Sequence, residues 1–246
     1  MSDESVIHVH FLPSMIRPGA LRGGVAVVLD VLRASTVMVQ ALGSGAKAIV
    51  PCLEIEDAQA VARSLPAGTA ILAGERFGLP IAGFDFGNSP RSFTPEVCAG
   101  KTIVMTTTNG TSAIHAALDA DEVLIGAFAN LSATIRRLRD DPRPVHLVAS
   151  GTNGSISFED VLLAGAIALG LAASRPSTGN DEAVLASAAW RSTQGEYLSD
   201  VLRQGIGGRR VVEIGLEADI ETAAKVDRFD LVAEVVREPL RIVRAH

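Results

Sequence analysis

The sequence predicts an α/β protein with a three-layer α/β/α arrangement around a mostly parallel or mixed β-sheet. Short apolar runs alternate with helical stretches along the 246 residues, which is the pattern of α/β proteins. One run, VAVVL at residues 25–29, has no polar alternation, as in a strand buried on both faces. With 48% hydrophobic residues the chain can bury a substantial core. We expect one domain over residues 1–246, with room for a small subdomain around residues 175–210.

The individual elements follow from local composition. Runs of Val, Ile, Leu and Ala between turn residues predict strands at residues 6–12, 25–31, 48–52, 69–75, 102–108, 122–128, 145–151 and 231–236. Apolar residues at helical spacing predict helices at residues 35–42, 55–65, 111–118, 131–140, 159–173, 196–204 and 219–226. Ser35 and Asn130 are the expected N-caps of two of these helices.

Two stretches need separate treatment. VLLAGAIALGLAA at residues 161–173 has thirteen residues, whereas a membrane span needs about 20. It also follows Glu159 and Asp160 directly, so we expect a helix buried in the protein. The long segment after strand 69–75 is rich in Gly and Pro but contains four phenylalanines. A solvated linker would not retain them, so we expect an ordered loop folded over something.

Composition limits the classes of partner. The net charge of −6 argues against a nucleic-acid surface, because neutralising phosphates requires a basic face. Cys52 and Cys98 are far apart and the first residues do not resemble a signal peptide, so we expect a reduced, cytoplasmic compartment and no membrane. The mean hydropathy of +0.30 suggests a homo-oligomer.

Polar side chains follow five of the predicted strands at the point where each strand ends. In open α/β sheets, ligands bind beyond the carboxyl ends of the strands, so these groups should meet at one rim. The groups are Asp30 with Arg33, Glu75 with Arg76, Thr106 to Thr111, Asn130, and Gly151 to Asp160. This coincidence is the main indication of an active site.

Several of these side chains suit a hard cation such as Mg²⁺, which prefers carboxylates and water. The candidate ligands are Asp30, Glu75, Asp85, Glu159 and Asp160. Glu159 and Asp160 also stand where a helix begins, so capping and compensation of the helix dipole are an equal alternative for them. Asp85 has a turn-stabilising alternative.

Other groups at the same rim suit an anion. The guanidinium groups of Arg33 and Arg76 match phosphate, sulfonate or carboxylate through two parallel hydrogen bonds, although a structural ion pair is an alternative for each. MTTTNGTSA at residues 105–113 brings hydroxyl groups and an Asn-Gly turn to a helix N-terminus, where an ordinary strand–turn–helix joint is equally consistent. Neither a Walker pattern nor GxGxxG occurs, which disfavours nucleotides.

Four segments resemble, in order, the 2-phosphosulfolactate phosphatases, the ComB family. They are VVLDVLRAST, GERFGLPIAGFDFGNSP, TTTNGTSAI and SGTNGSISFEDVLLAGAI, and the tail DIETAAKVDRFDLV is similar to the family's ending. The resemblance implies Mg²⁺-dependent hydrolysis of 2-phospho-3-sulfolactate to 3-sulfolactate and phosphate, a step toward coenzyme M. That substrate carries three anionic groups: a phosphate, a sulfonate and a carboxylate. Binding them would explain why the rim needs both a divalent cation and arginine side chains.

The resemblance and the strand-end pattern together assign candidate roles. The catalytic candidates are Asp30, Arg33, Glu75 and Arg76. The substrate-binding candidates are Ser35, Thr36, Asn88, Ser89, Thr107, Thr108, Asn109, Gly110, Thr111 and Asn130. The metal candidates are Asp30, Glu75, Glu159 and Asp160, and the implied cofactor is Mg²⁺.

The expected chemistry is metal-assisted phosphoryl transfer, in which Arg33 or Arg76 and the TNGT amides hold the transferring group. Attack by water is favoured over an aspartyl-phosphate on Asp30, because the DxD pattern of the latter route is absent. One rival is an isochorismatase-like hydrolase, which needs a catalytic cysteine after a late strand, whereas Cys98 precedes a strand. The other rival is a non-enzymatic binding protein for a small phosphate or sulfonate anion.

Overall fold

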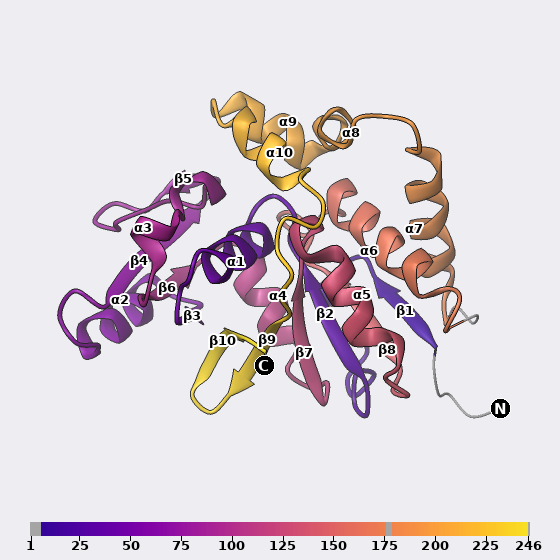
Figure 1. Cartoon of the computed structure of the whole chain (residues 1–246), viewed down its shortest axis with the longest axis horizontal. Helices are drawn as coiled ribbons and strands as arrows, with labels where there is room; N and C mark the ends of the chain where they lie inside the picture. Colours follow the sequence, from indigo (N-terminus) through magenta and orange to yellow (C-terminus); the bar gives the residue numbers. More distant parts are fainter. Residues whose placement is uncertain (1–5, 176–178, 246) are drawn as a thin grey trace.

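The computed structural model describes residues 6–175 and 179–245, which form a layered α/β fold (Figure 1). The strands are β1 (Ile7–His10), β2 (Val25–Leu29), β3 (Ala48–Pro51), β4 (Ala70–Arg76), β5 (Leu79–Pro80), β6 (Thr102–Thr106), β7 (Glu122–Gly126), β8 (Val145–Ala149), β9 (Ala233–Arg237) and β10 (Leu240–Arg244). The α-helices are α1 (Ala34–Gly43), α2 (Ile55–Ser64), α3 (Pro95–Cys98), α4 (Gly110–Ala117), α5 (Leu131–Arg139), α6 (Phe158–Leu171), α7 (Asp181–Ser192), α8 (Leu198–Gln204), α9 (Ile206–Glu213) and α10 (Glu217–Ala223). Short 3₁₀ turns cover Pro13–Met15, Pro90–Ser92 and Phe128–Asn130.

The strands form a mixed sheet with the order β1-β8-β2-β7-β9-β10-β3-β6-β4-β5. β1, β8, β2 and β7 pair in parallel, and β3, β6 and β4 make a second parallel group. The β9–β10 hairpin is inserted between the groups in antiparallel pairing, and Ile242 bridges to Ile49 of β3. The predicted fold class is therefore confirmed. β10 lies outside the sequence-based expectation, because LRIVR is only five residues long and its two arginines interrupt the apolar run that would indicate a strand.

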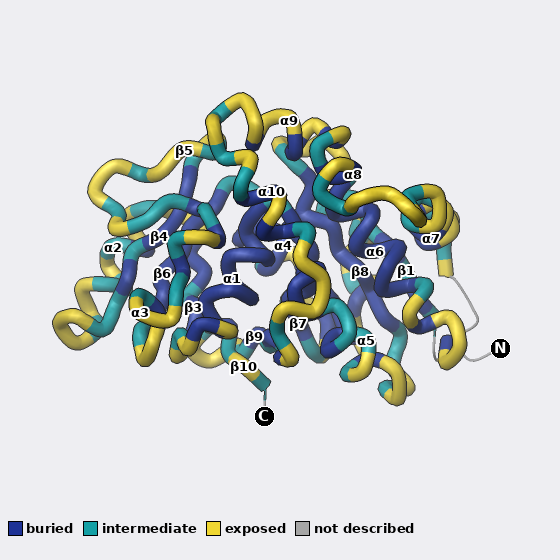
Figure 2. Tube along the Cα trace, turned by 45° about the horizontal axis from the view of Figure 1, so that its top comes forward, coloured by how far each residue is buried: buried dark blue, intermediate teal, exposed yellow. Residues whose placement is uncertain are grey.

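Helices cover both faces of this sheet. Alternate residues of β2 point to opposite sides, so that Ala26 and Val28 pack with α1 and α4, and Val25 and Val27 pack with α6 and α7. Helix α2 packs on β4 and β6 over a smaller third cluster. Figure 2 shows α1, α6 and the central strands as mainly buried, while most exposed residues lie in the loops and outer helices. This is the predicted three-layer arrangement.

Helix α6 accounts for the most apolar stretch of the sequence. Eleven of its fourteen residues are buried, because it packs between the sheet and helices α5 and α7. The predicted buried helix is thus confirmed. Within the described residues, no helix combines the length and the apolar character that crossing a membrane would require.

Helices α7 and α8 lie within residues 175–208, where the sequence shows no motif, and α9 and α10 follow them. α8 and α10 correspond to the predicted helices 196–204 and 219–226, whereas α7 and α9 were not expected. α7 does carry a capping signal, since the side chain of Asn180 accepts a hydrogen bond from the N–H of Ala183. The predicted subdomain at 175–210 includes residues 176–178, outside the described residues, and the domain division stays a prediction. In Figure 1, α8, α9 and α10 lie together above the carboxyl end of β2.

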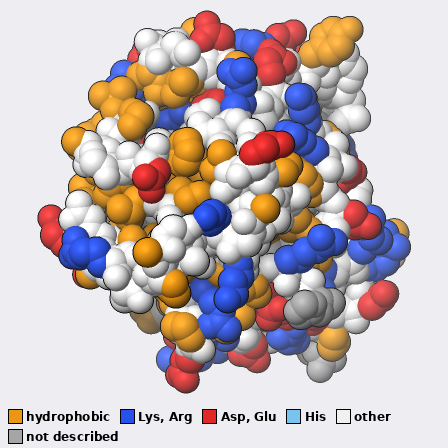
Figure 3. Space-filling view, turned by 60° about the vertical axis from the view of Figure 1, so that its left-hand side comes forward, with side chains coloured by type: hydrophobic (Ala, Val, Ile, Leu, Met, Phe, Trp, Pro, Cys, Tyr) orange, Lys and Arg blue, Asp and Glu red, His pale blue; other side chains and the backbone are white. Residues whose placement is uncertain are grey.

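The surface carries some exposed apolar side chains beside the β4–β5 hairpin. Phe77 and Leu79 are 71% and 55% exposed. On the face turned forward in Figure 3, hydrophobic groups lie among side chains of both charge signs. Exposed apolar groups are compatible with the expected homo-oligomer, which stays a prediction.

Candidate active site

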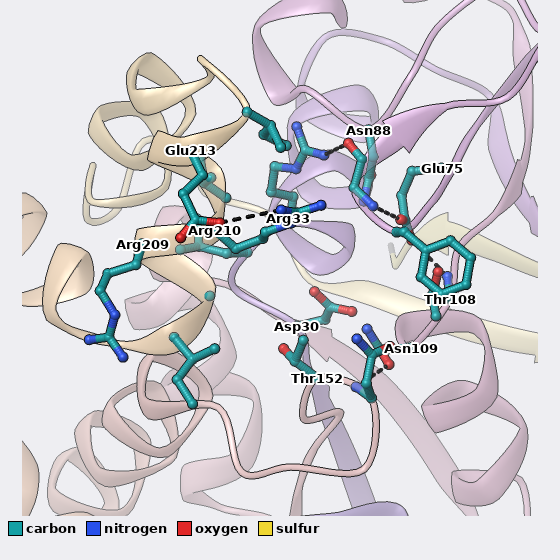
Figure 4. A pocket seen from close by; sticks show the side chains of 18 residues that line it. Asp30, Arg33, Glu75, Asn88, Thr108, Asn109, Thr152, Arg209, Arg210 and Glu213 are labelled. Atoms are coloured by element: carbon teal, nitrogen blue, oxygen red, sulfur yellow. Dashed lines mark hydrogen bonds and ion pairs between the residues drawn. The ribbon is translucent and has the colours of Figure 1, made fainter.

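A cavity of about 370 Å³ lies where the loops after β2, β4, β6 and β8 meet. Asp30, Thr108 and Thr152 come from the loops after β2, β6 and β8, and Glu75 comes from the carboxyl end of β4 itself. Helix α9 forms the opposite wall (Figure 4). The carboxyl ends of strands from both parallel groups therefore converge on one small volume, as the strand-end pattern predicted.

Asp30 is held rigidly at the end of β2. Its carboxylate accepts a hydrogen bond of 3.0 Å from the N–H of Ala34, the first residue of α1. Burial, together with the negative charge of Glu75, raises the pKa of Asp30 to about 6, against the hydrogen bond from Ala34. Burial makes the ionised form of this carboxyl group unfavourable, and a cation bound beside it would offset that cost.

Ser35 and Thr36 support this turn instead of facing the cavity. The Ser35 hydroxyl accepts a hydrogen bond from the N–H of Asp30 and donates one to its carbonyl oxygen, at 3.1 and 2.8 Å. Thr36 donates to the carbonyl oxygen of Val31 at 2.7 Å. The predicted N-cap role of Ser35 is wrong, because Ser35 lies inside α1, which begins one residue earlier. Both hydroxyl groups fix the backbone that presents Asp30.

Glu75 joins β4 to the loop after β6. Its two carboxylate oxygens accept hydrogen bonds from the N–H groups of Thr108 and Gly78, at 2.7 and 2.6 Å. The side chain is buried and lines the cavity. Because each oxygen retains a further lone pair, Glu75 can still bind a cation beside Asp30.

Arg33 reaches the cavity, but its charge is already paired. It makes a 2.9 Å ion pair with Asp219 of α10, and the two side chains are 4% and 1% exposed. It also donates to the carbonyl oxygen of Gly78 at 2.8 Å. Ser89 donates to the other oxygen of Asp219 at 2.6 Å, so the predicted NSP turn meets the same acid. The arrangement matches the ion-pair alternative and ties α10 to the loop after β2.

Arg76 does not line the cavity. Its guanidinium donates to the carbonyl oxygens of Glu75 and Leu53 and to the hydroxyl of Thr106, at 2.9, 3.1 and 2.9 Å. This corrects the expectation that Arg76 faces the bound anion. Because its donors are spent on backbone and hydroxyl oxygens, the side chain fastens β4 to its neighbours.

The loop after β6 places a helix N-terminus against Asp30. Thr107 and Thr111 are buried and bond to each other's backbone, at 3.2 and 2.8 Å, so they shape the loop and do not face the cavity. Thr108 and Asn109 do line the cavity. The side-chain carbonyl oxygen of Asn109 accepts a 3.0 Å hydrogen bond from the backbone N–H of Asn153. The two Asn-Gly turns of the sequence therefore touch at this site.

Gly110 is required by this close approach, and replacing it should be costly. A Cβ at position 110 would lie 2.6 Å from the Cβ of Ala34 and 2.7 Å from a carboxylate oxygen of Asp30. Gly110→Ala should therefore lower the free energy of unfolding by about 1–3 kcal/mol and displace Asp30. Urea denaturation and phosphate release would measure both effects. Gly154→Ala is a control for a glycine of the other Asn-Gly turn, since its added Cβ meets no atom but carries the strain of a positive φ. Equal activity losses in the two variants would contradict the prediction.

The predicted set of four metal ligands divides into two pairs. Asp160 is fully engaged beneath the cavity, where it accepts hydrogen bonds from Val31, Gly151 and Ser150 at 2.8, 3.2 and 3.2 Å. Glu159 is 1% exposed and packs against α9, since a Cβ on Gly207 would lie 1.9 Å from its carboxyl oxygen. Neither acid lines the cavity, whereas Asp30 and Glu75 do.

Burial dominates the electrostatics of the acids beneath the cavity. It raises the pKa of Glu159 to about 7, against a hydrogen bond that the carboxylate accepts from its own backbone N–H and with a further contribution from the charge of Asp30. Burial also raises the pKa of Asp160 well above its usual value, with the charges of Asp30 and Glu159 adding to the effect. Across residues 6–175 and 179–245, no group of three or more His, Cys, Asp or Glu side chains is arranged to hold a metal ion.

Two residues still fit a magnesium ion at the cavity. Mg²⁺ is commonly held by one or two carboxylates, with substrate phosphate oxygens and waters completing its octahedron. Asp30 and Glu75 line the same cavity and repel each other electrostatically, as the raised pKa of Asp30 reflects. A divalent cation between them would remove that repulsion. The residues present therefore fit a site held by Asp30 and Glu75, whereas the other two candidates, Glu159 and Asp160, do not line the cavity.

Buried polar atoms without partners point to a ligand. In the described part of the chain, Asn88 Oδ1 and Thr108 Oγ1 are buried and have no hydrogen-bond partner in the protein. Both residues line the cavity. Glu159 Oε2 and Arg175 Nε lack partners in the same way outside the cavity, so it is the position of the two cavity atoms beside the carboxylates of Asp30 and Glu75 that indicates a polar ligand.

Asn130 is structural and lies outside the cavity. It precedes α5 as predicted, but its side chain makes no capping bond to that helix. The amide instead accepts from the N–H of Ala127 at 2.9 Å and donates to the carbonyl oxygens of Ile125 and Leu231 at 3.2 and 3.3 Å. It therefore pins the end of β7 to the segment before β9, which corrects its assignment to substrate binding.

Several lining residues were not among the named site candidates. Thr152 and Asn153 fall in the stretch 151–160 that was expected at the rim, but neither was given a role. The Asn-Gly pair recurs after two strands, at 109–110 and 153–154, and this recurrence could have identified Asn153. Gly207, Arg209, Arg210 and Glu213 of α9 had no sequence signal, because a Gly-rich start followed by two arginines matches no known motif.

Neither cysteine is placed for nucleophilic attack. Cys52 and Cys98 are both buried free thiols, and neither lines the cavity. Burial raises the pKa of Cys98 to about 11. A low thiolate fraction outside the cavity gives no support to a cysteine-dependent hydrolase.

The fold and site define an α/β protein with an acidic, polar pocket at its strand ends, suited to a small anion and a hard cation. Comparison with known proteins is more specific. Residues 10–238 match the family described as 2-phosphosulpholactate phosphatase. The chain belongs to this family, and is accordingly a phosphoric monoester hydrolase.

Curated relatives agree with the family match over nearly the whole chain. A probable 2-phosphosulfolactate phosphatase of Caldanaerobacter subterraneus subsp. tengcongensis is 39% identical over 209 residues, covering 85% of this chain and 86% of the relative. One from Synechococcus sp. (strain JA-3-3Ab) is 39% identical, covering 94% and 96%. One from Clostridium perfringens (strain SM101 / Type A) is 34% identical, covering 92% of each.

Proposed function

We propose that this protein hydrolyses 2-phospho-3-sulfolactate to 3-sulfolactate and inorganic phosphate in the cavity beside Asp30, with Mg²⁺ as cofactor. The observation that carries the proposal is the convergence of Asp30 and Glu75 with two unpartnered polar atoms, on Asn88 and Thr108, in one cavity. Family membership adds the phosphatase chemistry. We further propose a cytoplasmic setting and a step toward coenzyme M.

Asp30 and Glu75 would hold the cation, which supplies charge neutralisation for the phosphate oxygens when it is bound. Thr108 Oγ1 can donate a hydrogen bond to a phosphate oxygen, since it has no partner in the protein. Glu75 fixes the position of Thr108 through its backbone N–H. Positioning and charge neutralisation account for most of phosphoryl-transfer catalysis, so these contacts suffice for the proposed reaction.

Attack by water is the proposed route, and Asp30 would orient it or accept its proton. Asp30 is anchored through Ala34, which fixes its carboxylate at the wall of the cavity where the phosphate would bind. An aspartyl-phosphate on Asp30 is the alternative route. The stereochemical course at phosphorus, followed with a phosphate group made chiral by oxygen isotopes and sulfur, would distinguish the two, because one direct displacement inverts the configuration and two successive displacements retain it.

Turnover tests the proposal against a passive anion-binding protein. We expect phosphate release from 2-phospho-3-sulfolactate with Mg²⁺ present, and a loss of at least about 100-fold after chelation and dialysis. Adding Mg²⁺ back should restore the rate. Binding of the substrate without release of phosphate, with or without Mg²⁺, would refute the enzymatic assignment. Full activity after chelation would refute the cofactor assignment alone.

A further inference from the structure

We propose that Arg210 of α9 binds the sulfonate of the substrate and thereby sets the enzyme's preference for a sulfonated phosphomonoester. This inference rests on the proposed function. It assigns a specificity role to a wall of the cavity for which the sequence offered no motif.

The charge distribution of the cavity leaves few cations for the substrate. Among the described residues, the arginines that line it are Arg33, Arg209 and Arg210. Arg33 is neutralised by Asp219 in a buried ion pair, and Arg76 lies outside the cavity. The guanidinium groups available to a bound anion are therefore those of α9.

The two arginines of α9 differ in where their side chains go. Arg209 donates to the carbonyl oxygen of Gln204, which draws its guanidinium toward the α8–α9 junction. Arg210 reaches from α9 toward Arg33 over the cavity in Figure 4. Its nearest carboxylate is Glu213, at 3.3 Å, and the two side chains are 51% and 64% exposed. Such an exposed, long ion pair contributes little to stability. A substrate anion can therefore replace Glu213 as the partner of Arg210 at a small cost in free energy.

The chemistry of the three anionic groups decides which one meets Arg210. The phosphate belongs with Asp30, Glu75 and their cation, because it is the group that reacts. The substrate carboxylate is attached to the carbon that bears the phosphate ester, and carboxylate oxygens are good ligands for a hard cation. The carboxylate can therefore bind the same cation as the phosphate. The sulfonate is one bond further from the phosphate, and its oxygens suit a guanidinium. α9 lies across the cavity from the strand-end loops that carry Glu75 and Thr108.

Paired substrates test this assignment. We would measure kcat and KM for 2-phospho-3-sulfolactate and for 2-phospholactate, which lacks only the sulfonate, with the wild-type enzyme, Arg210→Ala, Arg210→Lys and Arg203→Ala. Arg210→Ala should reduce kcat/KM for the sulfonated substrate by about 10- to 100-fold, mainly through KM, because it removes a charged hydrogen bond. The value for 2-phospholactate should stay within about 2-fold. Arg210→Lys should recover part of the loss.

Arg203→Ala is the matched control. Arg203 lies on α8, pairs with Asp200 and Glu221, and does not line the cavity, so its removal changes the net charge equally. It should leave both substrates unaffected. Calorimetric binding of 3-sulfolactate gives a second measure without turnover, and its Kd should rise in Arg210→Ala only.

Each other outcome overturns the inference. Equal losses on both substrates in Arg210→Ala would show a general role, and no loss on either would show that Arg210 does not meet the substrate. If the wild-type enzyme released no phosphate from either compound, the proposed function would fall and this inference with it. An active wild-type enzyme with an unaltered preference in Arg210→Ala would remove the inference alone.

Discussion

Asp30→Asn should reduce phosphate release by at least about 10³-fold while the protein stays folded. Asparagine keeps the shape of the side chain and an oxygen for the 3.0 Å hydrogen bond from Ala34. It removes the negative charge that, with Glu75, attracts the cation. It also removes the group proposed to orient or deprotonate water, so binding and chemistry both suffer.

Stability separates this effect from misfolding. Because burial and the charge of Glu75 disfavour the Asp30 anion, a neutral asparagine should leave the protein as stable as the wild type or more so when Mg²⁺ is absent. Thermal melts should show that added Mg²⁺ raises the Tm of the wild type but not that of the variant. An active Asp30→Asn enzyme, or one whose Tm still responds to Mg²⁺, would contradict the role of Asp30 as a ligand.

Asp85→Asn is a matched control for this experiment. Asp85 was a candidate ligand from the sequence, but in the structure its carboxylate accepts a 2.8 Å hydrogen bond from the N–H of Leu72 and it does not line the cavity. The same chemical change there should leave phosphate release within about 2-fold. A loss of activity comparable with that of Asp30→Asn would show that removing an acidic side chain outside the cavity is as harmful as removing one inside it.

The part of the site that sequence reasoning found is the part that follows from strand order and local turns. An unbroken apolar run ending in Asp30 predicts a buried strand with a functional carboxyl end, and the structure places that end beside Thr108 and Asn109. The family resemblance also identified the hydroxyl groups of Ser35 and Thr36, although not that they bond to the backbone of the same turn. Sequence position indicates that a polar side chain lies near a site. It does not indicate which way the side chain points.

The remainder depends on contacts between distant segments. Asp219 meets Arg33 across 186 positions, and no periodicity or motif links the two. The β9–β10 hairpin divides the sheet into two parallel groups, which a simple alternation of strands and helices cannot reveal. Arg210 reaches the cavity only because α8, α9 and α10 fold back over the end of β2. Each of these features is set by tertiary packing, and the positions of Asp219 and Arg210 alter the charge available at the site.

The Arg33–Asp219 pair should be the costliest ion pair to break. Removing one member of a buried pair leaves an uncompensated charge, which typically costs about 3–5 kcal/mol. The side chains are 4% and 1% exposed, and Asp219 also holds Ser89. Asp219→Ala should therefore lower the Tm on the order of 10 °C. It should also reduce activity, because α10 is no longer tied to the loop that carries Asp30.

Two further variants give this prediction its sharpest test. Asp200→Ala breaks an exposed pair with Arg203, at 64% and 34% exposure, and should cost at most about 1 kcal/mol. The double variant Arg33→Met/Asp219→Leu replaces the buried pair by apolar groups and should recover most of the stability lost in Asp219→Ala, because no charge is left buried. The activity of the double variant should stay low, because it lacks the hydrogen bond from Arg33 to the carbonyl oxygen of Gly78. Gly78 lines the cavity and donates a hydrogen bond to Glu75.

Urea denaturation of the three proteins, with phosphate release measured in parallel, would show whether stability and activity separate in this way. If the double variant stayed as unstable as Asp219→Ala, the cost would come from lost packing and not from the unpaired charge of Arg33. If it regained activity together with stability, the pair would serve the fold alone. Because Asp219 already balances its charge, Arg33 is expected to influence the substrate indirectly, by holding Gly78 and α10 in place around the cavity.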